Sequence, residues 1–118
     1  PTAIGFDPDD APDEARRQLD AWRTIQRSHG VANGLFVASC NRVGHEPDRS
    51  GAGRDAEFWG HSFVCGPQGE ILAEAGEDPQ VVLVDVDRQR TEAVRRIWPF
   101  LRDRRIDDYA DLTRRYVD

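Results

Sequence analysis

The sequence predicts a layered α/β fold with a mixed sheet, and three stretches of the chain support this prediction. A strand-turn-strand pattern runs from Trp59 to Ala73, an amphipathic helix pattern covers about 12–29, and a β-branched run covers 81–86. The expected order along the chain is strand, helix, strand, long loop, hairpin, strand and helix. Strands that alternate with helices and then form a hairpin are typical of a sheet with helices packed against it.

The segment 59–73 reads as two strands, 61–65 and 70–73, joined by the turn Gly66-Pro67-Gln68-Gly69. Proline presets φ in such a turn, and Gly69 tolerates a positive φ. An isolated hairpin is only marginally stable in water, so these two strands require a larger sheet around them.

The start of the first helix has recognisable signals. Asp10 or Asp13 offers a side chain for the N-cap, and Pro12 suits the first turn. Glu14 places a negative charge near the positive end of the helix dipole. The helix is therefore expected to begin at Pro12 or Asp13.

The body of this helix is amphipathic. Its apolar face is expected to contain Leu19, Trp22 and Ile25, opposite a face rich in arginine and aspartate. Gly30 or the pair Asn33-Gly34 is expected to end it, because both adopt the left-handed conformation readily. Such a helix covers one face of a sheet.

The remaining strands are expected at three places. Residues 2–4 read as the end of a strand closed by Gly5, and 35–41 as a strand buried on both faces. Residues 42–57 form a polar, glycine-containing stretch and are expected to be a long loop with a functional role. The run 81–86 is expected to be a strong strand because it is rich in β-branched residues.

The C-terminal part is expected to form a helix and then an arm. Asp87 can cap a helix that Pro99 stops. The segment 99–118 is highly charged with spaced apolar side chains, which suits an arm along another surface, including another subunit. A solvated, frayed terminus is the alternative.

Composition excludes several classes of function. The net charge of −6 argues against nucleic-acid binding, no stretch is apolar enough to span a membrane, and no cofactor-binding motif is present. Cys40 and Cys65 are expected to be buried and reduced, which fits a cytoplasmic protein. The chain contains neither methionine nor lysine, so it reads as a fragment or a processed chain and offers no amine for catalysis.

The polar residues do not assemble a recognisable active site on their own. His61 and Ser62 are neighbours on an expected strand, where successive side chains point to opposite faces, so they cannot form a hydrolase dyad. The spacing of cysteines and histidines does not match a zinc site, and no metal is expected. The residues alone indicate an α/β domain of unassigned purpose.

Several blocks of the sequence, however, resemble a known family. They are PTAIG (1–5), DAWRTIQRSHGVANG (20–34), NRVG (41–44), FWGHSFVCGPQGEILAEA (58–75) and WPFLRDRRIDDY (98–109). In this order they are similar to the C-terminal portion of nitrilase-superfamily carbon–nitrogen hydrolases. The combination of the first and last blocks is narrower and resembles the N-carbamoylputrescine amidase branch.

The resemblance implies a fold and a reaction. The family folds as an α-β-β-α sandwich, of which 1–118 would be the C-terminal part, and its members associate into oligomers. They hydrolyse a carbamoyl or amide compound with a cysteine thiolate, a glutamate base and a lysine that stabilises the oxyanion, without a cofactor. N-carbamoylputrescine would yield putrescine, ammonia and carbon dioxide in polyamine biosynthesis.

The same resemblance places the three catalytic groups before this chain. Neither Cys40 nor Cys65 matches the position of the nucleophile, and the chain has no lysine. The 118 residues alone are therefore expected to be inactive. The alternative is a non-catalytic half-domain that acts as an interaction module, because half of a sandwich leaves the inner faces of its strands 35–41, 61–65 and 81–86 without a partner.

The resemblance also implies roles in the pocket wall. Thr2 and Ala3 would line the carbamoyl end, and Asp7 would face the distal ammonium of a diamine, with an exposed loop acid as the alternative. Trp59 would lie against the aliphatic chain of the substrate, with a core position as the alternative.

Three further residues would support the pocket without touching the substrate. Asn41 is expected to fix the segment 43–46 through backbone hydrogen bonds. His61 and Ser62 are expected to act as supports, with bonding of the hydroxyl to the backbone as the main contact.

Overall fold

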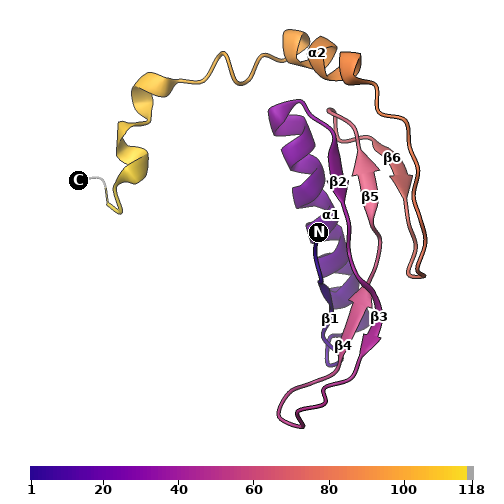
Figure 1. Ribbon diagram of the computed structural model, residues 1–118. Helices are drawn as coiled ribbons and strands as arrows, with labels where there is room; N and C mark the ends of the chain where they lie inside the picture. The colour runs from indigo at the N-terminus through magenta and orange to yellow at the C-terminus, as the bar shows by residue number, and fades with distance from the viewer. Residues whose placement is uncertain (117–118) are drawn as a thin grey trace.

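The computed structural model describes residues 1–116 and contains two helices, six short strands and two 3-10 turns in these residues (Figure 1). The helices are α1 (Pro12–Asn33) and α2 (Arg88–Ile97). The strands are β1 (Gly5–Phe6), β2 (Val37–Ser39), β3 (Val43–Glu46), β4 (Ala56–Trp59), β5 (Phe63–Cys65) and β6 (Ile71–Glu74). The 3-10 turns are η1 (Ile106–Asp108) and η2 (Ala110–Thr113).

The strands form two three-stranded antiparallel sheets, ordered β1-β4-β3 and β2-β5-β6. Both sheets belong to one long ribbon with a single register. Val37 lies opposite Cys65. Val43, which follows Val37 by six residues, lies opposite Trp59, which precedes Cys65 by six residues. The ribbon is interrupted only around Asn41, where Thr2 forms a parallel bridge.

The turn predicted at 66–69 is confirmed. The Gly69 N–H donates to the Gly66 carbonyl at 2.9 Å, and Gly69 has a φ of 78°. Gly66 N–H donates to the Glu70 carbonyl at 2.8 Å, which closes the hairpin between β5 and β6. Trp59 and His61 lie outside this hairpin, because Trp59 ends β4 and His61 has a φ of 55°.

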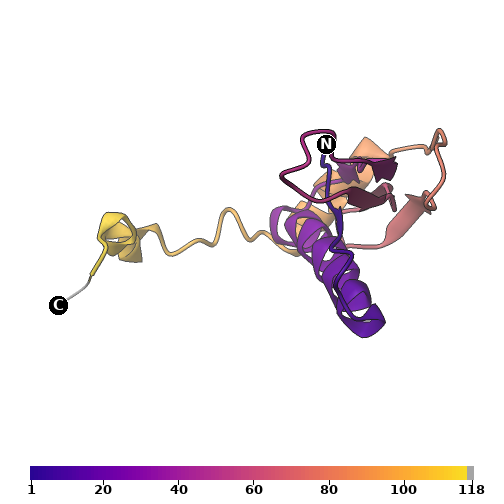
Figure 2. The ribbon, with the colours of Figure 1, turned by 90° about the horizontal axis from the view of Figure 1, so that it is seen from below.

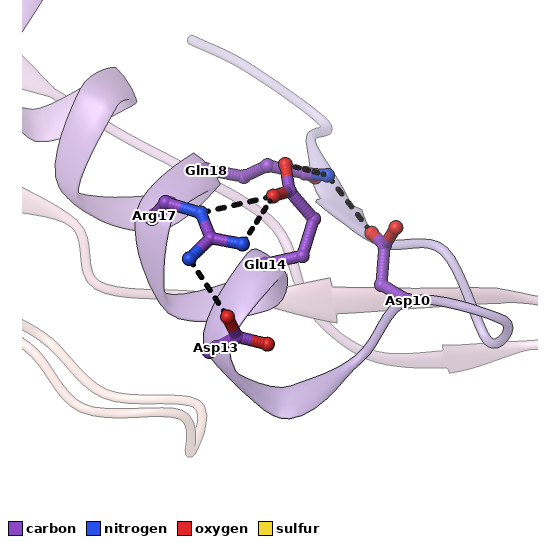
Figure 3. Close-up of polar contacts among 5 residues, drawn as sticks. All are labelled: Asp10, Asp13, Glu14, Arg17 and Gln18. Carbon is purple, nitrogen blue, oxygen red and sulfur yellow. Dashed lines mark hydrogen bonds and ion pairs between the residues drawn. The ribbon is translucent and has the colours of Figure 1, made fainter.

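The first turn of α1 is stabilised by charge. Arg17 donates to Asp13 at 2.7 Å and to Glu14 at 3.0 Å (Figure 3). The hydrogen bond from Arg17 to Glu14, followed by one from Gln18, holds the pKa of Glu14 below its usual value. The prediction of an aspartate N-cap is wrong: Ala11 is the N-cap and makes no side-chain hydrogen bond, whereas Asp10 accepts a bond from Gln18 at 2.9 Å.

The end of α1 lies four residues beyond the predicted His29. Gly30 is inside the helix, where a Cβ would approach the Gly66 carbonyl oxygen to 3.1 Å, so its small size serves a close contact with the turn. Gly34, with a φ of 55°, is the actual cap, and its N–H bonds back to the helix. A left-handed glycine is the usual way for a helix to end.

The core lies between α1 and one face of the ribbon. Trp22 packs edge-on against Phe63, with ring centroids 5.6 Å apart, and 6.1 Å from Trp59. Cys65 completes this buried cluster. Ile25 is 53% exposed and lies outside the cluster, contrary to the predicted helix face; Leu19 packs against it as predicted.

The opposite face of the sheet β2-β5-β6 is open. Ala38 and Cys40 are exposed, and Leu72 is 39% exposed. The prediction that 35–41 is buried on both faces is therefore wrong within these residues, and so is the prediction that Cys40 is buried. One helix layer and one sheet layer are present, which matches one half of a sandwich.

Two segments differ from the prediction in secondary structure. Residues 42–57 contain β3 and the first residues of β4, which pair with each other, and the loop between them is confined to 47–55. Residues 81–86 are extended but pair with no strand among the described residues. Their β-branched composition favours extended backbone without supplying a partner.

The part of the chain beyond α2 extends away from the rest of the molecule, whereas α2 lies near the end of α1 (Figures 1 and 2). Asp87 caps α2 as predicted, accepting from the Gln89 N–H at 2.9 Å, and the helix stops at Ile97 before Pro99. From Phe100 to Tyr116 all residues are exposed, including Ile106 and Leu112. The last two residues of the predicted arm 99–118 lie outside the described residues.

Within residues 1–116, neither helix is long and apolar enough to span a membrane.

Candidate functional site

The side chain of Asn41 joins three segments at the interruption of the ribbon. Its Oδ1 accepts from the Ile4 N–H at 3.0 Å and from the Thr2 hydroxyl at 2.8 Å. Its Nδ2 donates to the carbonyls of Ile4 at 2.9 Å and Gly60 at 3.0 Å. All four hydrogen-bonding positions of the amide are thus used by the chain itself. The structure assigns Asn41 to holding the N-terminal segment, and not the segment 43–46, which forms its own strand.

Thr2 is fixed by its backbone as well as its hydroxyl. The Thr2 N–H donates to the Cys40 carbonyl at 2.7 Å, and the Arg42 N–H donates to the Thr2 carbonyl at 3.2 Å. Ala3 lies between Thr2 and Ile4, which both form hydrogen bonds with the ribbon, and it is exposed. The segment containing Thr2 and Ala3 is thereby held against the middle of the ribbon.

Ser62 lies on the other side of the same interruption. Its hydroxyl accepts from the Asn41 N–H at 2.9 Å and is 3.2 Å from the Asn41 carbonyl oxygen. The hydroxyl therefore bonds to the backbone, as the sequence suggested. Asn41, Ser62 and Cys40 border a cavity of about 400 Å³ on the open face of the sheet, together with Val82 from the extended segment.

The side chain of His61 contacts two glutamates and does not join the group of Thr2, Asn41 and Ser62. Its Nδ1 lies 3.1 Å from Glu74, which also accepts from Arg23 of α1 at 2.6 Å. Its Nε2 is 3.9 Å from Glu77. His61 thus connects the interruption of the ribbon with β6 and, through Glu74, with α1.

Asp7 lies on a second cavity, of about 480 Å³. Its lining also includes the ring of Phe6 and three further acidic residues, Asp10, Asp55 and Glu57. Asp7 accepts from the Asp9 N–H at 3.0 Å, and Arg54 bridges it to Asp9 at 3.3 Å and 2.5 Å. His45 is also in the lining, 3.0 Å from Asp55, and with four carboxylates the lining is acidic.

Trp59 is 1% exposed and lies in the core, 5.2 Å from the ring of Phe6. The core position, which the sequence left open, is the one that the structure favours. Its indole contacts Phe6 at the back of the Asp7 cavity. Thr2, Asn41 and Ser62 are brought together, whereas Asp7 and Trp59 lie in a separate region around Phe6.

Sequence reasoning missed two partners of these residues. Arg54 was assigned to a loop, and only the structure shows that it bridges Asp7 and Asp9 of the acidic run FDPDD. Glu74 lies one residue beyond the predicted strand 70–73. It ends β6, and only the register of the hairpin places it beside His61.

The two cysteines differ in environment. Cys65 is fully buried, and burial raises the pKa of its thiol, so it stays protonated and unreactive. Cys40 is exposed and free. Within residues 1–116 no group of three or more histidine, cysteine, aspartate or glutamate side chains is placed to hold a metal ion.

This difference predicts selective labelling. At neutral pH the native chain is expected to take up one equivalent of iodoacetamide, on Cys40, and a second only after unfolding in guanidinium. Peptide mass spectrometry locates the label. The Cys40→Ser variant serves as the control and should remain unlabelled while folded. Rapid labelling of native Cys65 would contradict its burial.

Comparisons with known proteins agree in one family. The family model for carbon–nitrogen hydrolases matches residues 4–96. The N-carbamoylputrescine amidase of Solanum tuberosum is 38% identical over 95% of this chain, and the 2-oxoglutaramate amidase of Bacillus subtilis is 36% identical over 78% of it. The chain spans 37% and 33% of the length of these two relatives.

A solved structure supports the same conclusion. The crystal structure of a carbon–nitrogen hydrolase from Helicobacter pylori G27 superposes with a TM-score of 0.92 at 52% identity. The superposition covers 98% of this chain and 40% of that one. With a family model that matches most of its length, the chain belongs to the carbon–nitrogen hydrolases of the nitrilase superfamily.

Proposed function

We propose that this chain is part of an amidase that hydrolyses N-carbamoylputrescine, or a related carbamoyl or amide compound. One molecule of water and one of N-carbamoylputrescine would give putrescine, ammonia and carbon dioxide, a step in polyamine biosynthesis in the cytoplasm. The match to N-carbamoylputrescine amidases extends over 95% of the chain, whereas the match to the 2-oxoglutaramate amidase extends over 78%, which supports this substrate class.

In this proposal the chain supplies a wall of the pocket and the catalytic groups come from elsewhere in the hydrolase. The sequence contains no lysine for the oxyanion. Cys65 is buried, and the pKa of its thiol is raised by that burial, so it is unsuited to nucleophilic attack. Thr2 and Ala3 would line the carbamoyl end, held in place by Asn41 and Ser62 with His61 behind them.

The single observation that supports a diamine substrate best is the acidic cavity at Asp7. An ammonium group would be attracted by Asp7, Asp10 and Glu57, and the ring of Phe6 offers an apolar surface for a methylene chain. 2-Oxoglutaramate has a carboxylate at the end distal to its amide, which the same acids would repel. Trp59 would contribute by fixing Phe6 from the core.

The arm 99–118 would contact a second subunit in a homo-oligomer. Leu101, Ile106 and Leu112 are exposed by 48% or more, and they lie on a segment that extends away from the rest of the chain (Figure 2). Apolar side chains in this arrangement are typical of a segment that packs on another protein surface.

The test uses a chimera in which this chain replaces the matching region of the Helicobacter pylori hydrolase. Ammonia release is measured for the chimera and the isolated chain, with N-carbamoylputrescine and with 2-oxoglutaramate. We expect no turnover by the isolated chain, and a kcat/KM for the chimera about tenfold or more in favour of N-carbamoylputrescine.

The other outcomes each count against a part of the proposal. Turnover by the isolated chain would mean that the catalytic groups lie within it. A chimera that prefers 2-oxoglutaramate would contradict the substrate class. A folded chimera without activity on either compound would favour the non-catalytic interaction module, to which the open sheet face is suited.

A further inference from the structure

His61 has a backbone conformation that most side chains avoid. Its φ is 55°, and among the described residues no other residue apart from glycine has a positive φ. Histidine, asparagine and aspartate occur in the left-handed region more often than other side chains, whereas a β-branched residue there is strained. Gly60, directly before it, has a φ of 65°. Two successive left-handed residues therefore separate β4 from β5.

This bend lies opposite Asn41, because the register of the ribbon on either side places Asn41 across from His61. The Gly60 carbonyl accepts from Asn41 Nδ2 at 3.0 Å, and the Ser62 hydroxyl accepts from the Asn41 N–H at 2.9 Å. The φ of His61 sets how the peptide that carries the Gly60 carbonyl is oriented relative to Ser62. Both neighbours of His61 thus hold Asn41, and their directions depend on the backbone at His61.

Contacts with the end of β6 hold His61 in this conformation. Its N–H donates to the Gly76 carbonyl at 3.1 Å. Its Nδ1 lies 3.1 Å from Glu74, whose carboxylate also accepts from Arg23 of α1. A strained backbone conformation persists only where the surrounding structure fixes it, and such residues are frequent at functional sites.

We propose that His61 is a positioning residue of the pocket wall, which acts through its left-handed backbone and not through acid–base chemistry of its imidazole. The conformation directs the carbonyl before it and the hydroxyl after it toward Asn41, and Asn41 in turn bonds to Thr2 and Ile4. Regular strand backbone at position 61 would turn these groups away and release the N-terminal segment. The inference rests on the proposed function only for its effect on catalysis.

Two substitutions separate the backbone from the imidazole. His61→Gly and His61→Val both remove the imidazole, but glycine adopts a positive φ freely and valine does not. Hydrogen–deuterium exchange of the Ile4 amide, which donates to Asn41, measures the hold on the N-terminal segment in the 118-residue chain. We expect this amide to exchange at least about ten times faster in His61→Val, and within about threefold of the parent rate in His61→Gly.

His45→Val is the matched control. His45 Nε2 also lies against a carboxylate, 3.0 Å from Asp55, but the residue is in β3 and its φ is not positive. Valine is favourable in a strand, so this variant should leave the exchange of Ile4 unchanged. His61→Ala is strained less than His61→Val and should give an intermediate rate. The amides of α1 report whether each variant is folded.

The effect on catalysis is measured in the chimera with the Helicobacter pylori hydrolase. A displaced wall at the carbamoyl end would misalign the reacting group, so kcat for N-carbamoylputrescine should fall about tenfold or more in His61→Val. KM should change little, because Asp7 lies in a separate region. His61→Gly should recover most of the parent kcat. An equal fall of kcat in His61→Gly would mean that the imidazole itself is required, which would overturn the inference.

Three results of the exchange experiment would also overturn it. Equally fast exchange of Ile4 in His61→Gly and His61→Val would assign the role to the imidazole. Unchanged exchange in His61→Val would show that position 61 does not hold the segment. Loss of α1 protection in both His61→Val and His61→Ala would show that the residue supports the whole domain. A chimera inactive on N-carbamoylputrescine in every form would count against the proposed substrate, and the exchange of Ile4 would still decide the role of His61.

Discussion

The variant Trp59→Ala is expected to lose about 3–5 kcal/mol of unfolding free energy. Trp59 is 1% exposed and contacts the rings of Phe6 and Trp22, so truncation leaves a large cavity where α1 meets the ribbon. Because small domains have a total stability of only about 5–15 kcal/mol, this loss removes a large share of the stability and should shift the unfolding midpoint strongly to lower urea. Urea unfolding followed by circular dichroism measures the change.

Trp98→Ala provides the matched control. Trp98 is 40% exposed and stacks only on Phe100, at 5.9 Å. Its truncation is expected to cost less than about 1 kcal/mol. Equal losses for the two variants would mean that Trp59 does not belong to the core of the isolated chain.

The variant Asn41→Ala is expected to lose about 2–4 kcal/mol, because four hydrogen bonds disappear and their partners remain. Those partners are Thr2, Ile4 and Gly60. The variant should lower the stability of the whole domain and also the protection of one amide. The Ile4 amide, which donates to Asn41, is expected to exchange faster than any amide of α1. Hydrogen exchange and urea unfolding together measure both effects.

Asn33→Ala is the matched control for this variant. The Asn33 side chain makes a single hydrogen bond, to the His29 carbonyl at 2.9 Å on an exposed helix surface. The expected change is within about 0.5 kcal/mol. If Asn41→Ala were as mild, Asn41 would not hold the N-terminal segment, and the proposed pocket wall at Thr2 and Ala3 would have no fixed position.

Local sequence signals were sufficient wherever the structure depends on neighbouring residues. The turn at 66–69 and the cap at Asp87 follow from residue types within four positions of each other. Of the two glycines predicted at the end of α1, Gly34 is the cap, whereas Gly30 serves a contact with Gly66, which is distant in sequence. A glycine has the same appearance in the sequence whether it caps a helix or allows a close approach.

Long-range pairing explains the other differences. The ribbon joins 37–46 to 56–65 in one register, so what read as a long loop contains two strands. The strand predicted at 81–86 is not formed, because no partner for it lies within the described residues. Periodicity predicts that a segment is extended, but only a partner makes it part of a sheet.

Only part of the candidate site was predictable, because some of its contacts depend on how distant segments pack. The Thr2–Asn41–Ser62 group involves three residues that the family resemblance had selected, and the structure joins them by hydrogen bonds. The contact of Arg54 with Asp7 and that of Glu74 with His61 cross between elements. No spacing in the sequence encodes such contacts, because both depend on how the elements pack.

The kinetics of Asp7→Asn in the Helicobacter pylori chimera test the central proposal most directly, namely that this chain forms the ammonium-binding wall of the pocket. With N-carbamoylputrescine as substrate, KM is expected to rise about tenfold or more with little change in kcat, because one charge contact with the ammonium is lost. Asp9→Asn, which removes the other carboxylate bound by Arg54, should leave KM nearly unchanged. An unchanged KM in Asp7→Asn, or an equal rise in both variants, would contradict the proposal.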